Sequence, residues 1–192
     1  MKTITKTLYE FNDLSEDAKE KAREWYREGA LDYEWYDTVY EDAKTIGKLM
    51  GIDIDNIYFS GFWSQGDGAC FEGSYEYVKG SVKAVKEHAP LDTELHQIAE
   101  SLRDIQRREF YRVNATVKHS GHYEHKYCTR INVYDYAIPD TEEAIAELLR
   151  DFMDWIYHQL ETEYEYLVSD EVVEDTILAN EYTFNERGNR EY

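Results

Sequence analysis

The sequence predicts an α+β fold, in which a four- or five-stranded antiparallel sheet built from hairpins packs against amphipathic helices. Strand-like stretches come in pairs joined by glycine-containing turns, which is typical of antiparallel sheets. Stretches with apolar residues three and four apart precede, separate and follow these pairs, as in amphipathic helices. Apolar residues make up 42% of the 192 residues, enough for a core and too many for a disordered chain.

The first 56 residues predict a strand and two helices. Thr3–Phe11 begins with alternating apolar and polar residues, which indicates a strand. Ser15 is a good N-cap for a first helix, whose helically spaced residues are Ala18, Ala22, Trp25 and Tyr26. A second helix is expected over about 34–50, and Gly51 follows it as a left-handed stop.

The middle of the chain predicts two hairpins with a helix between them. The expected strands cover 56–63, 69–78, 111–118 and 123–136. Gly66-Asp67-Gly68 is a strong turn signal for the first hairpin, and Ser120-Gly121 lies near the tip of the second. Apolar residues at helical spacing after Pro90 predict the helix.

The last third predicts a long helix that begins near Asp140, then a short helix over 172–179 and a strand over 182–184. The buried face of the long helix consists of Ile145, Leu148, Leu149, Phe152, Trp155, Ile156 and Leu160. The length suits a single domain over 1–192. Its C-terminal part, about 139–180, is predicted to be helical and acidic.

Charge and cysteine content narrow the class of protein. The chain has 41 acidic and 21 basic side chains and a net charge of −20, which disfavours direct binding to nucleic acid or to an anionic membrane. It has no apolar run of 18 residues and no apolar signal core. Two cysteines cannot build a disulfide scaffold. We therefore expect a soluble cytoplasmic protein with reduced thiols.

The negative charge is concentrated in one part of the chain. Residues 139–192 contain 16 acids and 3 bases, whereas residues 57–138 have a net charge of only −1. Six carboxylates recur at helical spacing in the long helix: Glu143, Glu147, Asp151, Asp154, Glu161 and Glu165. A rigid column of carboxylates could imitate a DNA backbone and fill a basic cleft. The alternative is a solvated face that only keeps the protein soluble.

The segment FSGFWSQGDGACFEG, residues 59–73, is the most distinctive of the chain. It lacks the Gly-Lys-Ser/Thr end of a phosphate-binding loop, and no helix is expected after it. Its glycines suit a tight turn and a bulge. Four of its side chains could contact a partner at the hairpin tip: Phe62, Trp63, Gln65 and Asp67.

This segment, together with the opening LYEFNDLSEDAKEKAREWYRE, resembles a largely uncharacterised family of small acidic phage and prophage proteins, some of which are labelled antitoxin-like. The resemblance covers roughly residues 1–78. It implies a phage or prophage origin and, by association, an inhibitor of host defence such as an anti-CRISPR or anti-restriction protein. The family contributes no catalytic residues.

Enzymatic and metal-binding signals are weak. Cys70 is the best nucleophile candidate, but a buried strand cysteine is the favoured interpretation. His119, His122 and His125 recur every three residues; a two-residue turn at Ser120-Gly121 would place the first two face to face and the third on the opposite side. No catalytic residue, metal site or cofactor is therefore predicted.

The leading hypothesis is a phage-encoded inhibitor that acts as an acidic DNA mimic on a basic nucleic-acid-binding complex of the bacterial host, through the six carboxylates. The alternative is an antitoxin-like interaction module that uses the aromatic hairpin.

Overall fold

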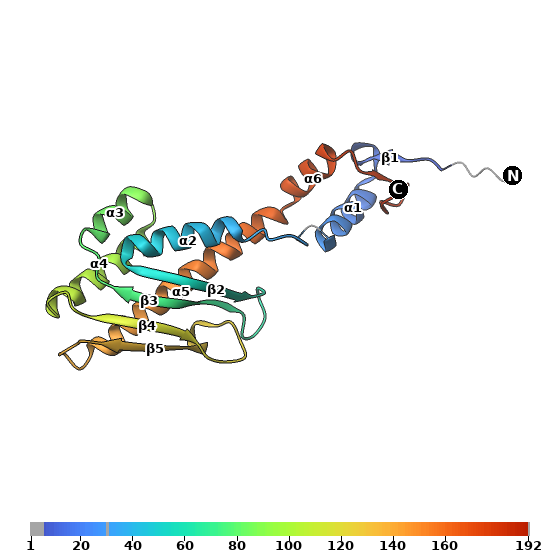
Figure 1. The fold of residues 1–192 in the computed structure, drawn as a ribbon. Helices are drawn as coiled ribbons and strands as arrows, with labels where there is room; N and C mark the ends of the chain where they lie inside the picture. Colours follow the sequence, from blue (N-terminus) through green and yellow to red (C-terminus); the bar gives the residue numbers. More distant parts are fainter. Residues whose placement is uncertain (1–5, 30, 192) are drawn as a thin grey trace. The chain divides into compact units, whose positions relative to one another are not determined.

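The computed structural model describes residues 6–29 and 31–191 and has the predicted α+β fold (Figure 1). The chain forms two compact units: unit 1 comprises residues 1–35 and 162–192, and unit 2 comprises residues 36–161. Each is described by itself below. The expectation of a single domain over 1–192 stays a prediction.

Unit 2 is built on a four-stranded antiparallel sheet. Its strands are β2 (Ile52–Ser60), β3 (Gly68–Glu76), β4 (Asn114–His119) and β5 (Thr129–Tyr134), and they lie side by side in this order. The pairs β2–β3 and β4–β5 are the two predicted hairpins. The register of β2 shifts between Ile54 and Asn56. Ile52, Ile54 and Ile57 are all buried. The bulge adds one residue between Ile54 and Ile57, so the three side chains face the core although their spacing in the sequence differs.

The helices of unit 2 are α2 (Asp37–Met50), α3 (Ser81–His88), α4 (Thr93–Arg108) and most of α5 (Thr141–Leu167). The ring of Phe71 on β3 contacts that of Phe152 on α5, with centroids 6.1 Å apart. A Cβ on Gly47 of α2 would lie 3.6 Å from the same Phe152 ring. Strand β3 and two helices therefore meet in one core.

The three longer helices of unit 2 confirm the predictions from helical spacing, whereas α3 was not predicted. Only Ser81 and Val85 are buried in it, so its eight residues carry no apolar stripe that a periodicity argument could detect.

A buried glutamine frames the turn between α4 and β4. The Gln106 amide nitrogen donates to the Val113 carbonyl (2.6 Å) and to the Tyr75 hydroxyl (3.2 Å), and the Gln106 amide oxygen accepts from the Val113 N–H (3.2 Å). Within this turn, Phe110 and Tyr111 have left-handed backbones, with φ of 57° and 60°. Bulky residues rarely adopt this conformation, so the fixed ends of the turn hold it in place.

A buried carboxylate joins this turn to the start of α5. Glu109 is 1% exposed and accepts hydrogen bonds from the Thr141 hydroxyl (2.7 Å) and from the backbone N–H groups of Ala137 and Ile138 (2.9 Å each). The Thr141 and backbone hydrogen bonds outweigh the effect of burial and lower the pKa of Glu109.

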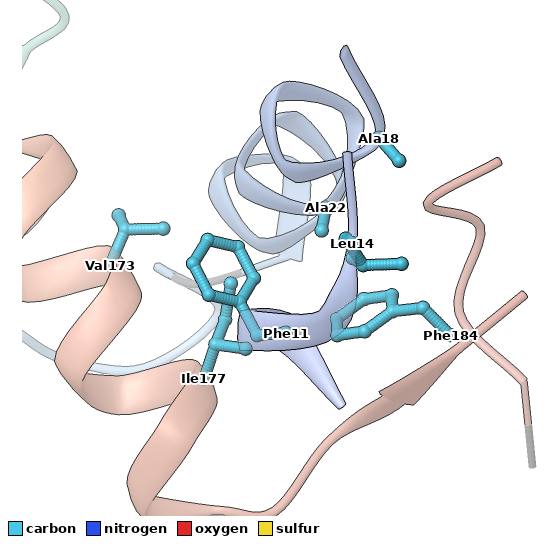
Figure 2. Packing of buried hydrophobic residues seen from close by; sticks show 7 residues of the cluster. All are labelled: Phe11, Leu14, Ala18, Ala22, Val173, Ile177 and Phe184. Atoms are coloured by element: carbon cyan, nitrogen blue, oxygen red, sulfur yellow. The ribbon is translucent and has the colours of Figure 1, made fainter. Parts of the chain in front are cut away.

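Unit 1 combines an early and a late part of the chain. Its elements are β1 (Tyr9–Glu10), the 3-10 turn η1 (Phe11–Asp13), α1 (Glu16–Gly29), α6 (Asp170–Ala179) and β6 (Thr183–Phe184). Figure 2 shows their shared cluster, made of Phe11, Leu14, Ala18, Ala22, Val173, Ile177 and Phe184. The helices α1 and α6 and the strand β6 confirm the predictions.

The predicted strand over Thr3–Phe11 is mostly wrong. Residues 3–5 lie outside the described residues, residues 6–8 are not in a strand, and Phe11 begins η1. Only Tyr9–Glu10 pairs, because β6 offers just two residues as a partner.

None of the helices in residues 6–29 and 31–191 is long and apolar enough to cross a membrane.

Candidate functional site

Two loops pack on each other at one end of the sheet of unit 2. Loop 61–67 joins β2 to β3, and loop 120–128 joins β4 to β5. A Cβ on Gly68 would lie 3.0 Å from Cδ2 of His125, and one on Gly66 would lie 3.7 Å from the Tyr123 ring. Glycine at position 68 therefore permits the close approach of the two loops.

Loop 61–67 is fixed both internally and against α5. The Asp67 carboxylate accepts from the Ser64 N–H (2.7 Å), which closes the turn. The Phe62 ring lies 5.5 Å from the Tyr157 ring of α5. Trp63 has a left-handed backbone (φ 67°) and is 67% exposed. The loop thus presents an exposed indole from a restrained backbone.

Loop 120–128 is anchored on the same helix. Lys126 forms an ion pair with Asp154 of α5. The Tyr127 ring lies beneath two cations, 5.2 Å from the Lys126 ammonium and 5.5 Å from the Arg150 guanidinium. Tyr127 remains 63% exposed. Both loops therefore place exposed aromatic side chains beside α5.

The carboxylates predicted to form the acidic face lie on α5. Glu143, Glu147, Asp151 and Glu165 are exposed, and Asp154 and Glu161 are half-buried. The first five belong to unit 2, and Glu165 belongs to unit 1. With about 3.6 residues per turn, the five share the side of α5 opposite its buried stripe.

Two of these carboxylates are paired within unit 2, and one of the two pairs joins residues far apart in the chain, which the sequence did not reveal. Asp154 pairs with Lys126, and Glu147 pairs with Arg150. Glu143, Asp151 and Glu161 form no ion pair with any described residue. The acidic column is therefore interrupted, because a lysine from the second hairpin folds onto it.

Partial burial and neighbouring charges raise the pKa of Asp151. Partial removal of water raises the pKa, and the neighbouring Asp154 and Glu147 raise it further, whereas Lys126 lowers it. The net shift is upward. A cation from a binding partner would stabilise the charged form of Asp151.

The predicted geometry of the three histidines is wrong. Strand β4 continues to His119, which pairs with Thr129, so the loop has nine residues, 120–128, instead of two. The His119 ring stacks on Tyr58, with centroids 4.9 Å apart, and the His125 Nδ1 accepts from the Tyr127 N–H. No group of three His, Cys, Asp or Glu side chains in the described ranges could hold a metal ion.

Cys70 is fully buried on β3, in line with its interpretation as a structural strand residue. Burial is the largest cause that raises the pKa of its thiol to about 12. A thiol with that pKa stays protonated at neutral pH and is a poor nucleophile.

Among the predicted hairpin residues, Gln65 is exposed and Asp67 serves the turn. Sequence reasoning missed Tyr123, Tyr127 and Lys126, because their importance depends on contacts with residues far away in the chain. The aromatic and basic character of 123–127 was the one available signal. We call loops 61–67 and 120–128, together with the exposed side of α5 between Glu143 and Glu161, the loop–helix surface.

Comparison with known proteins gives one family whose model covers this surface. No curated protein and no solved structure matches the chain. A family model described as a domain of unknown function, DUF8835, matches residues 35–170. This range contains all four strands of the large sheet and the whole loop–helix surface. The chain therefore belongs to the DUF8835 family.

Proposed function

We propose that this chain is a binding protein that occupies a cationic groove on a nucleic-acid-binding partner through the loop–helix surface. One observation carries the proposal: two loops with exposed aromatic side chains are anchored on the helix that presents the unpaired carboxylates. Trp63 and Tyr127 are both more than half exposed, and their loops are fixed on α5. Aromatic anchors in a restrained backbone are typical of binding hot spots.

The electrostatics favour a basic partner. Glu143, Asp151 and Glu161 are left without an ion pair in the described structure, and the chain as a whole carries −20. Such a field accelerates association with a cationic surface and repels nucleic acid itself. The resemblance to phage proteins makes a bacterial defence complex the class of partner that we propose.

The interrupted column favours a particular form of mimicry. Because Glu147 and Asp154 are neutralised within the chain, the charge pattern is an uneven row of three unpaired carboxylates, Glu143, Asp151 and Glu161, about 12 and 15 Å apart along α5. It is less suited to replace a long stretch of regularly spaced phosphates. We propose that these carboxylates enter the groove together with Trp63 and Tyr127 as anchors.

The first experiment uses charge reversal of the unpaired carboxylates. Immobilised wild-type chain and a Glu143→Lys, Asp151→Lys, Glu161→Lys variant are incubated with a bacterial host extract, and captured proteins are identified by mass spectrometry. We expect a basic nucleic-acid-binding protein on the wild-type chain only. The purified partner should lose DNA binding in a gel-shift assay when wild-type chain is added.

A matched variant controls for net charge. Asp53, Asp55 and Glu76 are exposed residues of strands β2 and β3, and their change to lysine alters the net charge equally. This variant should inhibit like the wild-type chain. Inhibition that survives in the α5 variant, or that both variants lose equally, contradicts the proposal.

The aromatic anchors distinguish this proposal from pure charge mimicry. Trp63→Ala should weaken binding to the identified partner about 10- to 100-fold, which is the range for a hot-spot aromatic. Calorimetric titration between low and high salt should show weaker binding by the wild-type chain as salt rises. An unchanged affinity after Trp63→Ala would restrict the site to the α5 carboxylates. An affinity that ignores salt would instead favour the antitoxin-like module.

A further inference from the structure

Among the residues that the structure describes, strand β5 forms an unpaired edge of the large sheet. It pairs with β4 along one side, and the sheet order places it last (Figure 1). Its six residues, Thr129–Tyr134, contain no proline, glycine or register shift. The opposite edge strand, β2, is interrupted by a bulge next to the exposed Asp53 and Asp55. Bulges and charges are the usual protection against edge pairing; β5 has no bulge, and Arg130 is its one charged residue.

The backbone pattern shows which groups face outward. The Cys128 carbonyl accepts from the Ser120 N–H at 2.7 Å and so points toward β4, whereas the Cys128 N–H donates to the His125 carbonyl. The N–H of His119, which lies opposite Thr129, points instead toward Glu72 of β3. Successive residues of a strand point these groups to alternate sides. The N–H and C=O groups of Thr129, Ile131 and Val133 therefore face the free edge.

The charges along this edge fit a second copy of the chain. Arg130 lies directly opposite Lys118 on β4, a like-charge pair that is unfavourable, and Arg130 forms no ion pair with a described residue. Residues 57–138, which include β5, carry a net charge of only −1, so the part of the chain around this edge adds little to the repulsion between two copies.

We propose that the chain forms a two-fold symmetric dimer by antiparallel pairing of β5 with β5 of a second copy, centred on Asn132. This register aligns the outward backbone groups of Ile131 and Val133 of the two copies. It also places Arg130 of each copy opposite the Tyr134 ring of the other, a cation–π pair. Tyr134 is 45% exposed and can accept this contact. The two-fold axis closes the assembly.

The test measures the mass of the full chain by analytical ultracentrifugation. The interface is one strand edge, so we expect a reversible dimer with a dissociation constant in the micromolar range, visible up to about 200 μM. A chain that stays at 22.8 kDa over that range overturns the proposal.

Two variants locate the interface. Asn132→Asp places like charges opposite each other on the axis and should weaken the dimer at least about 10-fold. Asn56→Asp makes the same change on β2, the opposite edge strand, and should leave the dimer intact. Equal weakening by both variants contradicts the proposed edge. Circular dichroism checks that both variants fold.

A cross-link tests the register. With Cys70 and Cys128 changed to serine, Asn132→Cys should form a disulfide-linked dimer under mild oxidation, because residues on the axis lie directly opposite each other. Asn56→Cys in the same background should not. A dimer that Asn132→Cys fails to cross-link overturns the register. This dimer does not depend on the proposed partner, so either inference can fail alone.

Discussion

Phe110 combines an exposed ring with a backbone that phenylalanine rarely adopts. The side chain is 83% exposed, so burial contributes little at this position, while its positive φ costs about 1–2 kcal/mol for a residue with a Cβ.

We therefore predict that Phe110→Gly raises the free energy of unfolding by about 0.5–1 kcal/mol, because glycine adopts this conformation without the steric cost. Urea denaturation measures the change. The opposite substitution is the control: Gly80 has φ of 89° and open space around it, so Gly80→Ala should cost about 1 kcal/mol. A loss of stability in Phe110→Gly would mean that the ring packs in solution.

Glu109 predicts a specific dependence of stability on pH. Its folded pKa is lowered, first by the Thr141 hydrogen bond. The resulting stabilisation is fully present above the pKa of an unfolded glutamate, about 4.3, and is lost as pH falls through the folded value.

Denaturation between neutral pH and about pH 3 should thus show falling stability, and Glu109→Gln should flatten that fall while lowering stability at pH 7. Glu94, an exposed residue in the first turn of α4, is the control for substitution by glutamine. An identical pH profile in wild type and Glu109→Gln would contradict the assignment.

At the scale of elements, Gln106 connects α4 to the start of β4. Gln106→Ala would leave the N–H and C=O of Val113 and the Tyr75 hydroxyl without their bonds in a buried place. We predict a loss of about 2–4 kcal/mol in the free energy of unfolding. Gln97→Ala, on the exposed side of the same helix, should change it by less than about 0.5 kcal/mol. An equal loss of stability in the two variants would mean that the Gln106 hydrogen bonds do not stabilise the turn.

Elements with a strong local pattern were predictable from the sequence. The apolar stripe of α5 and the Gly66-Asp67-Gly68 turn each depend on residues close together in the chain. The conformation of loop 120–128 was not predictable, because Lys126 reaches Asp154 and Tyr127 lies beneath Arg150 only after the sheet has packed on α5. The ion pair between Lys126 and Asp154 also neutralises part of the acidic face. The carboxylates of the candidate site were therefore predicted, and their partial pairing was not.

At the scale of the whole molecule, unit 1 depends on residues that lie far apart in the sequence. Phe184 is fully buried against Phe11, Leu14 and the alanines of α1 (Figure 2). Phe184→Ala should cost about 3–5 kcal/mol, as large-to-small changes in a core do.

Hydrogen exchange of the α1 amides measures this loss, since local opening of α1 exposes them to solvent. The exposed Leu178 of α6 provides the control: Leu178→Ala should leave α1 protection nearly unchanged. Unaltered α1 protection in Phe184→Ala would show that α1 does not depend on this contact.

The composition of that cluster has a consequence for synthesis on the ribosome. Ala18 and Ala22 are translated long before Val173, Ile177 and Phe184, which complete their surroundings. During translation, α1 therefore lacks these packing partners, and its apolar side stays exposed to water while the segment that carries the large sheet is made and can fold. Chaperones that bind short amphipathic segments during translation would meet α1 in this interval, and a pause in elongation before position 173 would lengthen it.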